Sequence, residues 1–190
     1  MFPVEVFQAT IGKLAALLRL HGIRFHLTGG LTSSTYGEPR MTQDIDVVVD
    51  PKQTFASIDQ FLESLDKSDF LFNTEAIRTA VDSAGMFQLL DKEESLKLDI
   101  YPREMIPGEL DRSESCEIFE GVFLPIVSRL DAAASKLVWI GKGSHKSRRD
   151  LRSIMRNADE SQANSVREMA QQLNLQELLD EVLAEADELQ

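Results

Sequence analysis

The segment Asp44–Asp50, with the sequence DIDVVVD, constrains the fold more than any other part of the chain. Its β-branched residues predict a strand. Alternate residues of a strand face opposite sides of a sheet, so Asp44 and Asp46 share one face. Ile45, Val47 and Val49 lie on the other face, where a core would bury them. The sequence therefore predicts a sheet with an apolar side and a side that carries two neighbouring carboxylates.

Two neighbouring carboxylates repel, and each raises the pKa of the other unless a cation neutralises them. A hard divalent cation such as Mg²⁺ suits this position, because it prefers oxygen ligands and is commonly held by one or two carboxylates together with phosphates. Asp99 offers further oxygens, since it points away from the apolar residues of its own predicted strand. Asp91 is the alternative third ligand. We therefore predict a site for Mg²⁺ or Mn²⁺ on Asp44, Asp46 and Asp99.

The rest of the chain alternates helical and extended patterns. Apolar residues three and four positions apart predict helices at 4–20, 54–66, 129–141, 146–157, 161–173 and 175–188. Alternating apolar and polar residues predict strands at 23–28, 86–90 and 96–101, with a hairpin turn at 91–95. Residues 104–121 are predicted to be irregular, and 122–127 to form an edge strand, because Pro125 cannot donate to a central ladder.

This order of elements predicts an α/β (α+β) fold, with a mixed sheet flanked by helices. The expected domains are an α/β core at 1–127 and a C-terminal helical region at 128–190 that packs on the core.

Charge limits the partners of the chain. The net charge of −12 argues against binding nucleic acid over a broad surface. Seven Lys and Arg residues nevertheless gather between Lys136 and Arg156, whereas the tail from Asp159 onwards is acidic. We expect the basic region to meet phosphates and the tail to stay solvated.

The lack of a membrane span or signal peptide and the low cysteine content predict that the protein is located in the cytoplasm. There is no apolar run of the roughly 18 residues that a membrane span needs, so we expect no membrane contact. The N-terminus lacks the pattern of a signal peptide. The single cysteine, Cys116, has no partner for an internal disulfide.

A glycine pair, Gly29–Gly30, lies between a predicted strand and a short helical stretch at Leu31–Tyr36. Without side chains, the two glycines would let a phosphate approach the backbone closely. Ser33 and its neighbours would add hydroxyl and amide donors for a triphosphate, helped by a helix N-terminus. Arg40, four residues before Asp44, would neutralise a further phosphate.

The pattern of Gly-Gly, thirteen residues, Asp-Ile-Asp and a later strand Asp resembles the DNA-polymerase-β-like nucleotidyltransferase superfamily. Within it, the string Tyr-Gly-x-x-Arg-x-Thr-x-Asp-Ile-Asp at 36–46 is similar to the AbiEii-type abortive-infection toxins and their minimal relatives. Ser135-Lys136-Leu137 and Arg149-Asp150-Leu151 resemble two helical motifs near the active site of that family.

The resemblance implies a nucleotidyltransferase fold and transfer of a nucleoside monophosphate from an NTP to a hydroxyl group. The implied metal ligands are Asp44, Asp46 and Asp99, and Lys136 and Asp150 would line the catalytic site. The implied nucleotide-binding residues are Gly29, Gly30, Ser33, Arg40 and Thr42. The acceptor would be an RNA such as tRNA, or a protein, and the chain would be the toxin of a toxin–antitoxin or phage-defence pair with an antitoxin partner.

Two other functions stay open from the sequence. One is transfer to a small molecule such as an aminoglycoside, because the acidic charge balance would suit a cationic substrate. The other is a non-catalytic nucleotide-binding protein that keeps the fold. The intact pair of Asp44 and Asp46 argues against the second, since buried carboxylates without a neutralising cation are costly.

Overall fold

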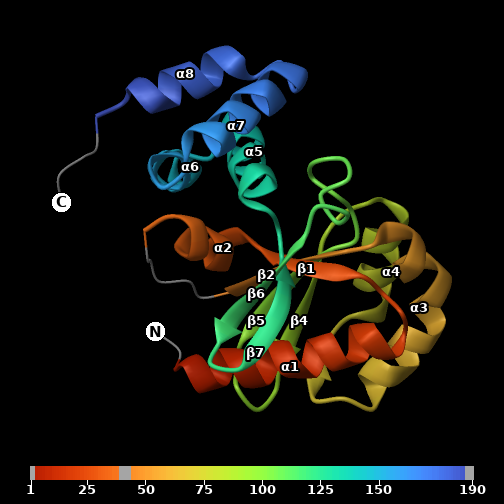
Figure 1. Cartoon of the computed structure of the whole chain (residues 1–190). Coiled ribbons are helices and arrows are strands. Elements are labelled where there is room, and N and C mark those ends of the chain that lie inside the picture. Colours follow the sequence, from red (N-terminus) through yellow and green to blue (C-terminus); the bar gives the residue numbers. More distant parts are fainter. Residues whose placement is uncertain (1–2, 39–43, 187–190) are drawn as a thin grey trace. The chain divides into compact units, whose positions relative to one another are not determined.

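The computed structural model describes residues 3–38 and 44–186. These residues form two compact units, drawn in Figure 1. The sheet unit contains residues 3–31 and 44–127, and the helical unit contains residues 32–38 and 128–186. Helix α2, Gly29–Tyr36, begins in the sheet unit and ends in the helical unit.

Seven strands form one mixed sheet in the described part of the sheet unit, in the order β3-β4-β5-β2-β1-β7-β6. Strand β2 is parallel to β5 and β1 is parallel to β7, whereas the other neighbours are antiparallel. The predicted α/β class with a mixed sheet is confirmed. The strands are β1 Phe25–Thr28, β2 Asp44–Val49, β3 Phe70–Leu71, β4 Phe87–Asp91, β5 Lys97–Tyr101, β6 Glu114–Phe119 and β7 Val122–Ile126.

The central strands bury the apolar face that the alternation predicts. Ile45 and Val47 of β2 lie opposite Leu98 and Ile100 of β5, and each of the four is at most 1% exposed. Burying apolar side chains of this size stabilises the fold by about 1.5–3 kcal/mol each. The same register leaves the acidic residues of β2 and β5 on the other face.

Two predictions about the end of the sheet are wrong. Residues 104–121 contain strand β6, which pairs with β7 in a hairpin that turns at Gly121. Strand β7 is not an edge strand, because it lies between β1 and β6.

Pro125 fits inside the sheet because β1 and β7 pair only between Leu27 and Ile126. Val127 donates to the Leu27 carbonyl at 2.9 Å, so Pro125, two residues earlier, also turns its nitrogen towards β1. No ladder bond is lost there, because the β1–β7 pairing begins only at Ile126.

Three helices of the sheet unit accompany the strands: α1 Val4–Leu20, α3 Pro51–Asp66 and α4 Thr74–Asp82. Figure 1 shows α3 and α4 together at one side of the sheet. Helix α3 begins earlier than predicted because Asp50 caps it, accepting hydrogen bonds from the amides of Lys52 and Gln53 at 3.0 Å. The sequence patterns gave no prediction for α4 or for the short strand β3, which follow the α3 helix.

Asp91, at the end of β4, ties helix α1 to the sheet. Its carboxylate accepts a hydrogen bond from the Thr10 hydroxyl at 2.8 Å and pairs with the Lys13 ammonium at 3.1 Å. Burial alone would raise the pKa of Asp91, but the bonds from Thr10 and Lys13 and from two backbone amides outweigh it and lower the pKa. Asp91 is therefore a structural residue, and the alternative that made it a metal ligand is wrong.

The helical unit contains α5 Arg129–Gly141, α6 Lys146–Arg156, α7 Glu160–Gln172 and α8 Gln176–Ala184. These bounds confirm the predicted helices to within a few residues. Helix α7 begins with a capping box between Asp159 and Gln162. The acidic side chains of α7 and α8 are largely exposed, as expected of a solvated tail. The apolar residues of the same two helices are buried: Val166, Ala170, Leu179 and Val182. In the part of the chain that the structure describes, no helix is long and apolar enough to cross a membrane.

Replacing Asp91 with Asn is expected to lower the free energy of unfolding by about 1–3 kcal/mol at pH 7, because a buried charged hydrogen-bond network loses its charge. The pKa of Asp91 is lower in the folded protein than in the unfolded chain. Its ionised form therefore stabilises the fold above about pH 3.9, the unfolded value, and this stabilisation is lost as the pH falls through the folded pKa.

Urea unfolding of both proteins between pH 3 and 7 measures this, and the two curves should converge at the acid end. The control is Glu93→Gln, which removes a carboxylate that also pairs with Lys13 but is largely exposed. We expect it to cost less than about 1 kcal/mol. Equal losses of unfolding free energy in Asp91→Asn and Glu93→Gln would contradict the structural role of Asp91.

Candidate active site

One row of polar side chains crosses four adjacent strands of the sheet unit. Thr28 of β1 lies opposite Asp46 of β2, Asp46 lies opposite Asp99 of β5, and Asp99 lies opposite Gln88 of β4. Directly opposite residues share a face, with Cβ atoms about 5 Å apart. The pairing of β2 with β5 thus brings Asp46 and Asp99 together, as the sequence predicts.

A second pair, Asp44 opposite Lys97, lies next to this row. The Lys97 ammonium is 3.0 Å from Oδ2 of Asp99 and 3.9 Å from Oδ2 of Asp44. The hydrogen bond to Asp99, together with the charges of Asp99, Asp44 and Asp46, raises the pKa of Lys97 above its ordinary value. Lys97 therefore stays protonated and offsets part of the negative charge.

Neutral donors hold two of the carboxylates. The side-chain amide of Gln88 donates to Oδ1 of Asp99 at 3.0 Å, and the Tyr101 hydroxyl donates to Oδ1 of Asp46 at 3.3 Å. Burial raises the pKa of Tyr101, and the charge of Asp46 raises it further. The phenol is therefore a stable donor at neutral pH.

Sequence reasoning missed Lys97, Tyr101 and Gln88. The signal for the first two was present, because Lys97, Asp99 and Tyr101 alternate along β5 and must share a face. Gln88 had no such signal, since its place opposite Asp99 depends on the register of the β4–β5 hairpin.

Gly29 lies against the carboxylate of Asp46. Its φ of +69° is in the left-handed region that favours glycine. A Cβ atom at this position would lie 1.9 Å from Oδ2 of Asp46, far inside contact distance. The first glycine of the predicted phosphate-binding pair is thus required by the close approach of the backbone to the acidic site.

The donor set fits a hard divalent cation, because Asp44 and Asp46 offer carboxylate oxygens on one face of one strand. Within residues 3–38 and 44–186, no three carboxylate, imidazole or thiol groups already converge as a metal cluster. The Lys97 ammonium instead lies beside the carboxylates.

A separate cluster forms inside the helical unit. The ammonium of Lys136 on α5 is 2.9 Å from Oδ2 of Asp150 on α6, and the Ser33 hydroxyl donates to the same oxygen at 3.2 Å. The side chains of Lys136 and Asp150 are only 12% and 6% exposed. The structure therefore joins three predicted site residues into one buried hydrogen-bonded group.

The predicted residues thus fall into three sets. The sheet unit holds Asp44, Asp46, Asp99, Gly29 and Gly30, and the helical unit holds Ser33, Lys136 and Asp150. The other two predicted nucleotide-binding residues, Arg40 and Thr42, lie outside the described residues.

The basic region on α6 is largely paired within the helical unit. Arg148 and Arg152 pair with Glu185, and Arg148 also pairs with Glu181 of α8. Glu38 accepts from Arg156 at 2.8 Å and from Arg149 at 3.4 Å. Acidic residues distant in the sequence therefore offset part of the positive charge of α6, while Arg149 and Arg156 stay 63% and 42% exposed.

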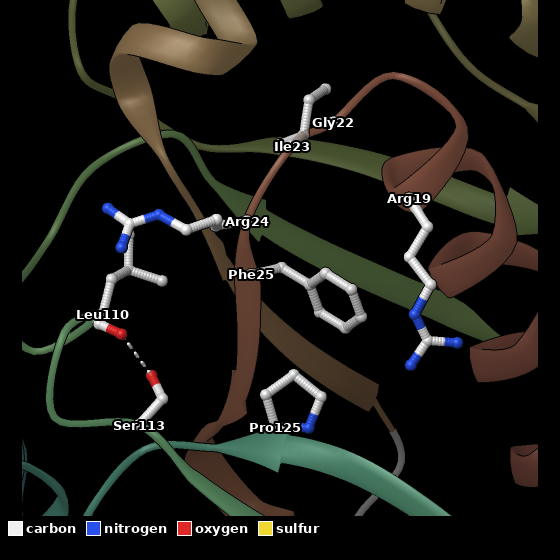
Figure 2. Close-up of a pocket in the computed structure, with 8 residues that line it drawn as sticks. All are labelled: Arg19, Gly22, Ile23, Arg24, Phe25, Leu110, Ser113 and Pro125. Carbon is white, nitrogen blue, oxygen red and sulfur yellow. Dashed lines mark hydrogen bonds between the residues drawn. The ribbon is translucent and has the colours of Figure 1, made fainter.

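A pocket of about 460 Å³ lies elsewhere in the sheet unit and is shown in Figure 2. It opens where β1 and β7 diverge, between Phe25 and Pro125. The guanidinium of Arg19 lies 5.9 Å from the centre of the Phe25 ring, and Arg24 pairs with Asp50 and Asp111. No predicted site residue lines this pocket, so it is distinct from the acidic row.

A family model described as "Nucleotidyl transferase AbiEii toxin, Type IV TA system" matches residues 14–185. The chain belongs to this AbiEii family. The match includes the glycine pair, the Asp44–Asp46 strand and the α5 and α6 motifs, so the resemblance seen in the sequence is confirmed.

Solved structures share the nucleotidyltransferase fold at low sequence identity. An antigenic nucleotidyltransferase-like protein from Paracoccidioides brasiliensis has 17% identity and a TM-score of 0.55, over 96% of this chain and 94% of its own. The antibiotic-resistance factor ANT(2'')-Ia has 13% identity and a TM-score of 0.51, over 97% and 91% of the two chains.

The lincosamide antibiotic adenylyltransferase LnuA, solved with lincomycin bound, also has 13% identity and a TM-score of 0.51. That likeness covers 83% of this chain and 99% of LnuA. The search of curated proteins gave no match.

Replacing Gly29 with Ala tests the close packing against Asp46. Gly121 is a matched control, because its φ of +71° is similar but its Cβ would meet no atom within 4 Å. We expect Gly121→Ala to cost about 1 kcal/mol of unfolding free energy, from backbone strain alone. Gly29→Ala should cost about 2–4 kcal/mol, because overpacking is added to strain. Urea unfolding measures both, and equal costs would contradict the packing described here.

Proposed function

We propose that this chain of the AbiEii family is a metal-dependent nucleotidyltransferase that transfers a nucleoside monophosphate from an NTP to a hydroxyl of RNA, such as tRNA, or of a protein. In the cytoplasm it would act as the toxin of a toxin–antitoxin or phage-defence pair. The supporting observation is the acidic row, in which Asp44 and Asp46 share a face and Asp46 lies opposite Asp99.

Asp44 and Asp46 would hold Mg²⁺ or Mn²⁺ through their carboxylate oxygens. When bound, such a cation lowers the pKa of an acceptor hydroxyl and offsets the charge of the phosphates. Gly29 supports this role, because its missing side chain lets the backbone and the Asp46 carboxylate come close together. Asp99 is the residue that would stand beside the acceptor and accept its proton.

In the proposed transfer, the acceptor oxygen attacks the α-phosphorus of the NTP, and its proton passes to the carboxylate of Asp99. A new oxygen–phosphorus bond forms, and the bond from the α-phosphorus to the bridging oxygen breaks. Pyrophosphate leaves, and the nucleoside monophosphate stays on the acceptor.

The phosphates would be bound by Gly29, Gly30, Ser33, Arg40 and Thr42. Lys136 is proposed to offset phosphate charge, and Asp150 to position it. The observation that supports this pair is their contact at 2.9 Å, with the Ser33 hydroxyl on the same carboxylate oxygen. A buried lysine held by a carboxylate is oriented before any phosphate binds.

One observation favours a second candidate, transfer to a small cationic molecule. Four arginines of α6 are paired with Glu38, Glu181 or Glu185, which reduces the positive charge available for RNA. The acceptor therefore has to be identified by experiment with both classes present.

The proposal is tested by transfer of label from each of the four NTPs carrying a radioactive α-phosphate. The wild type is incubated with Mg²⁺ or Mn²⁺ and with total RNA, cell protein or cationic small molecules, beside Asp44→Asn/Asp46→Asn. We expect label in RNA or protein with the wild type. The variant should transfer at least about 10³-fold less label, because it loses a main electrostatic contact to the transition state. Label only in small molecules would select the second candidate. No transfer to any acceptor would contradict the proposed enzyme.

The charge of α6 provides a further test of the RNA acceptor. Replacing Glu38 with Gln releases Arg149 and Arg156 from their shared carboxylate. If α6 contacts RNA, tRNA affinity should rise by roughly two- to fivefold at low salt, and the gain should shrink as salt is added. Filter binding measures this, with Glu63→Gln on the exposed surface of α3 as the control. Unchanged affinity would count against contact between these arginines and RNA.

A further inference from the structure

Lys97 occupies one corner of a four-residue group on the acidic face. Asp44 and Asp46 lie on β2, and Lys97 and Asp99 lie directly opposite them on β5. Because the two strands are parallel, the four side chains project from the same face of two adjacent strands. Three of them are negatively charged and one is positively charged.

The structure gives both oxygens of Asp99 a donor from the protein. Oδ1 accepts from the Gln88 amide and Oδ2 accepts from the Lys97 ammonium, each at 3.0 Å. The Asp99 side chain is only 10% exposed. A carboxylate that is buried and held in this way is already compensated without a metal ion.

Lys97 also brings positive charge to Asp44, since its ammonium lies 3.9 Å from Oδ2 of that residue. Removing Lys97 would take one positive charge and one hydrogen-bond donor from Asp99, which would favour a second ion beside Asp99.

We propose that Lys97 takes the place of a second divalent cation in this site, so that one ion binds on Asp44 and Asp46 while Asp99 stays paired with Lys97. This inference rests on the proposed function, because it concerns the metal site of that enzyme. It assigns Lys97 as a positioning residue that limits how many ions the site accepts.

The test is the number and affinity of Mn²⁺ ions bound by the full chain, measured by electron paramagnetic resonance of free Mn²⁺ without nucleotide. The wild type should bind one ion. Lys97→Met should bind a second ion, or bind the first about tenfold more tightly, because a nearby positive charge is removed. Lys97→Arg keeps the charge and should behave as the wild type.

Lys52→Met is the matched control for loss of one positive charge. Lys52 is exposed and lies in α3, beyond the opposite end of β2. It should leave the number of bound ions unchanged, with affinity within about twofold of the wild type, because exposed charges at a distance are screened.

Thermal unfolding provides a second readout that does not depend on activity. In EDTA, Lys97→Met should unfold at a lower temperature than the wild type, since Asp99 and Asp44 lose a nearby positive charge. Saturating Mn²⁺ should raise the unfolding temperature of Lys97→Met more than that of the wild type.

Two wild-type ions, or identical Mn²⁺ binding by the wild type and Lys97→Met, would overturn the inference and leave the proposed function standing. Mn²⁺ binding that survives Asp44→Asn/Asp46→Asn unchanged would overturn both, because the ion would then lie elsewhere.

Discussion

The parallel pairing of β2 with β5 is the constraint on which the site depends. It places Asp46 directly opposite Asp99 and Asp44 opposite Lys97. On the other face it buries Ile45 and Val47 of β2 against β5. A shift of one residue in this register would turn the apolar residues outwards and separate the acidic ones. The same pairing that forms the core therefore forms the acidic face.

The concentration of negative charge on that face has to be compensated by the protein. Lys97, Gln88 and Tyr101 do part of this with one positive charge and two neutral donors. Gly29 adds a steric condition, because any side chain there would displace the Asp46 carboxylate. These contacts hold the carboxylates in place, and their remaining charge favours a divalent cation.

Local patterns were enough to predict much of this. The alternation in 44–50 identified the shared face of Asp44 and Asp46, and the strand at 96–101 identified Asp99. Helix periodicity gave α1, most of α3 and the helices α5 to α8, and the motif string gave the family. These features depend on residues that are close together in the sequence.

What the sequence did not predict depends on contacts between distant residues. The internal position of β7 follows from strand order, and Pro125 is tolerated only because the pairing with β1 begins after it. The pairing of the α6 arginines follows from Glu181 in α8, from Glu185 directly after it and from Glu38. Asp91 is structural because Thr10 and Lys13 of α1 reach it across the sheet unit.

The most direct measurement of the central claim is calorimetric titration of the wild type with a non-hydrolysable NTP analogue, with Mg²⁺ and then with EDTA. Binding is expected only with Mg²⁺, and Asp44→Asn/Asp46→Asn should abolish it, because the carboxylates of β2 hold the cation that joins the phosphates to the protein. Equally tight binding in EDTA, or binding unchanged by the double substitution, would contradict the assignment of the acidic row as the nucleotide and metal site.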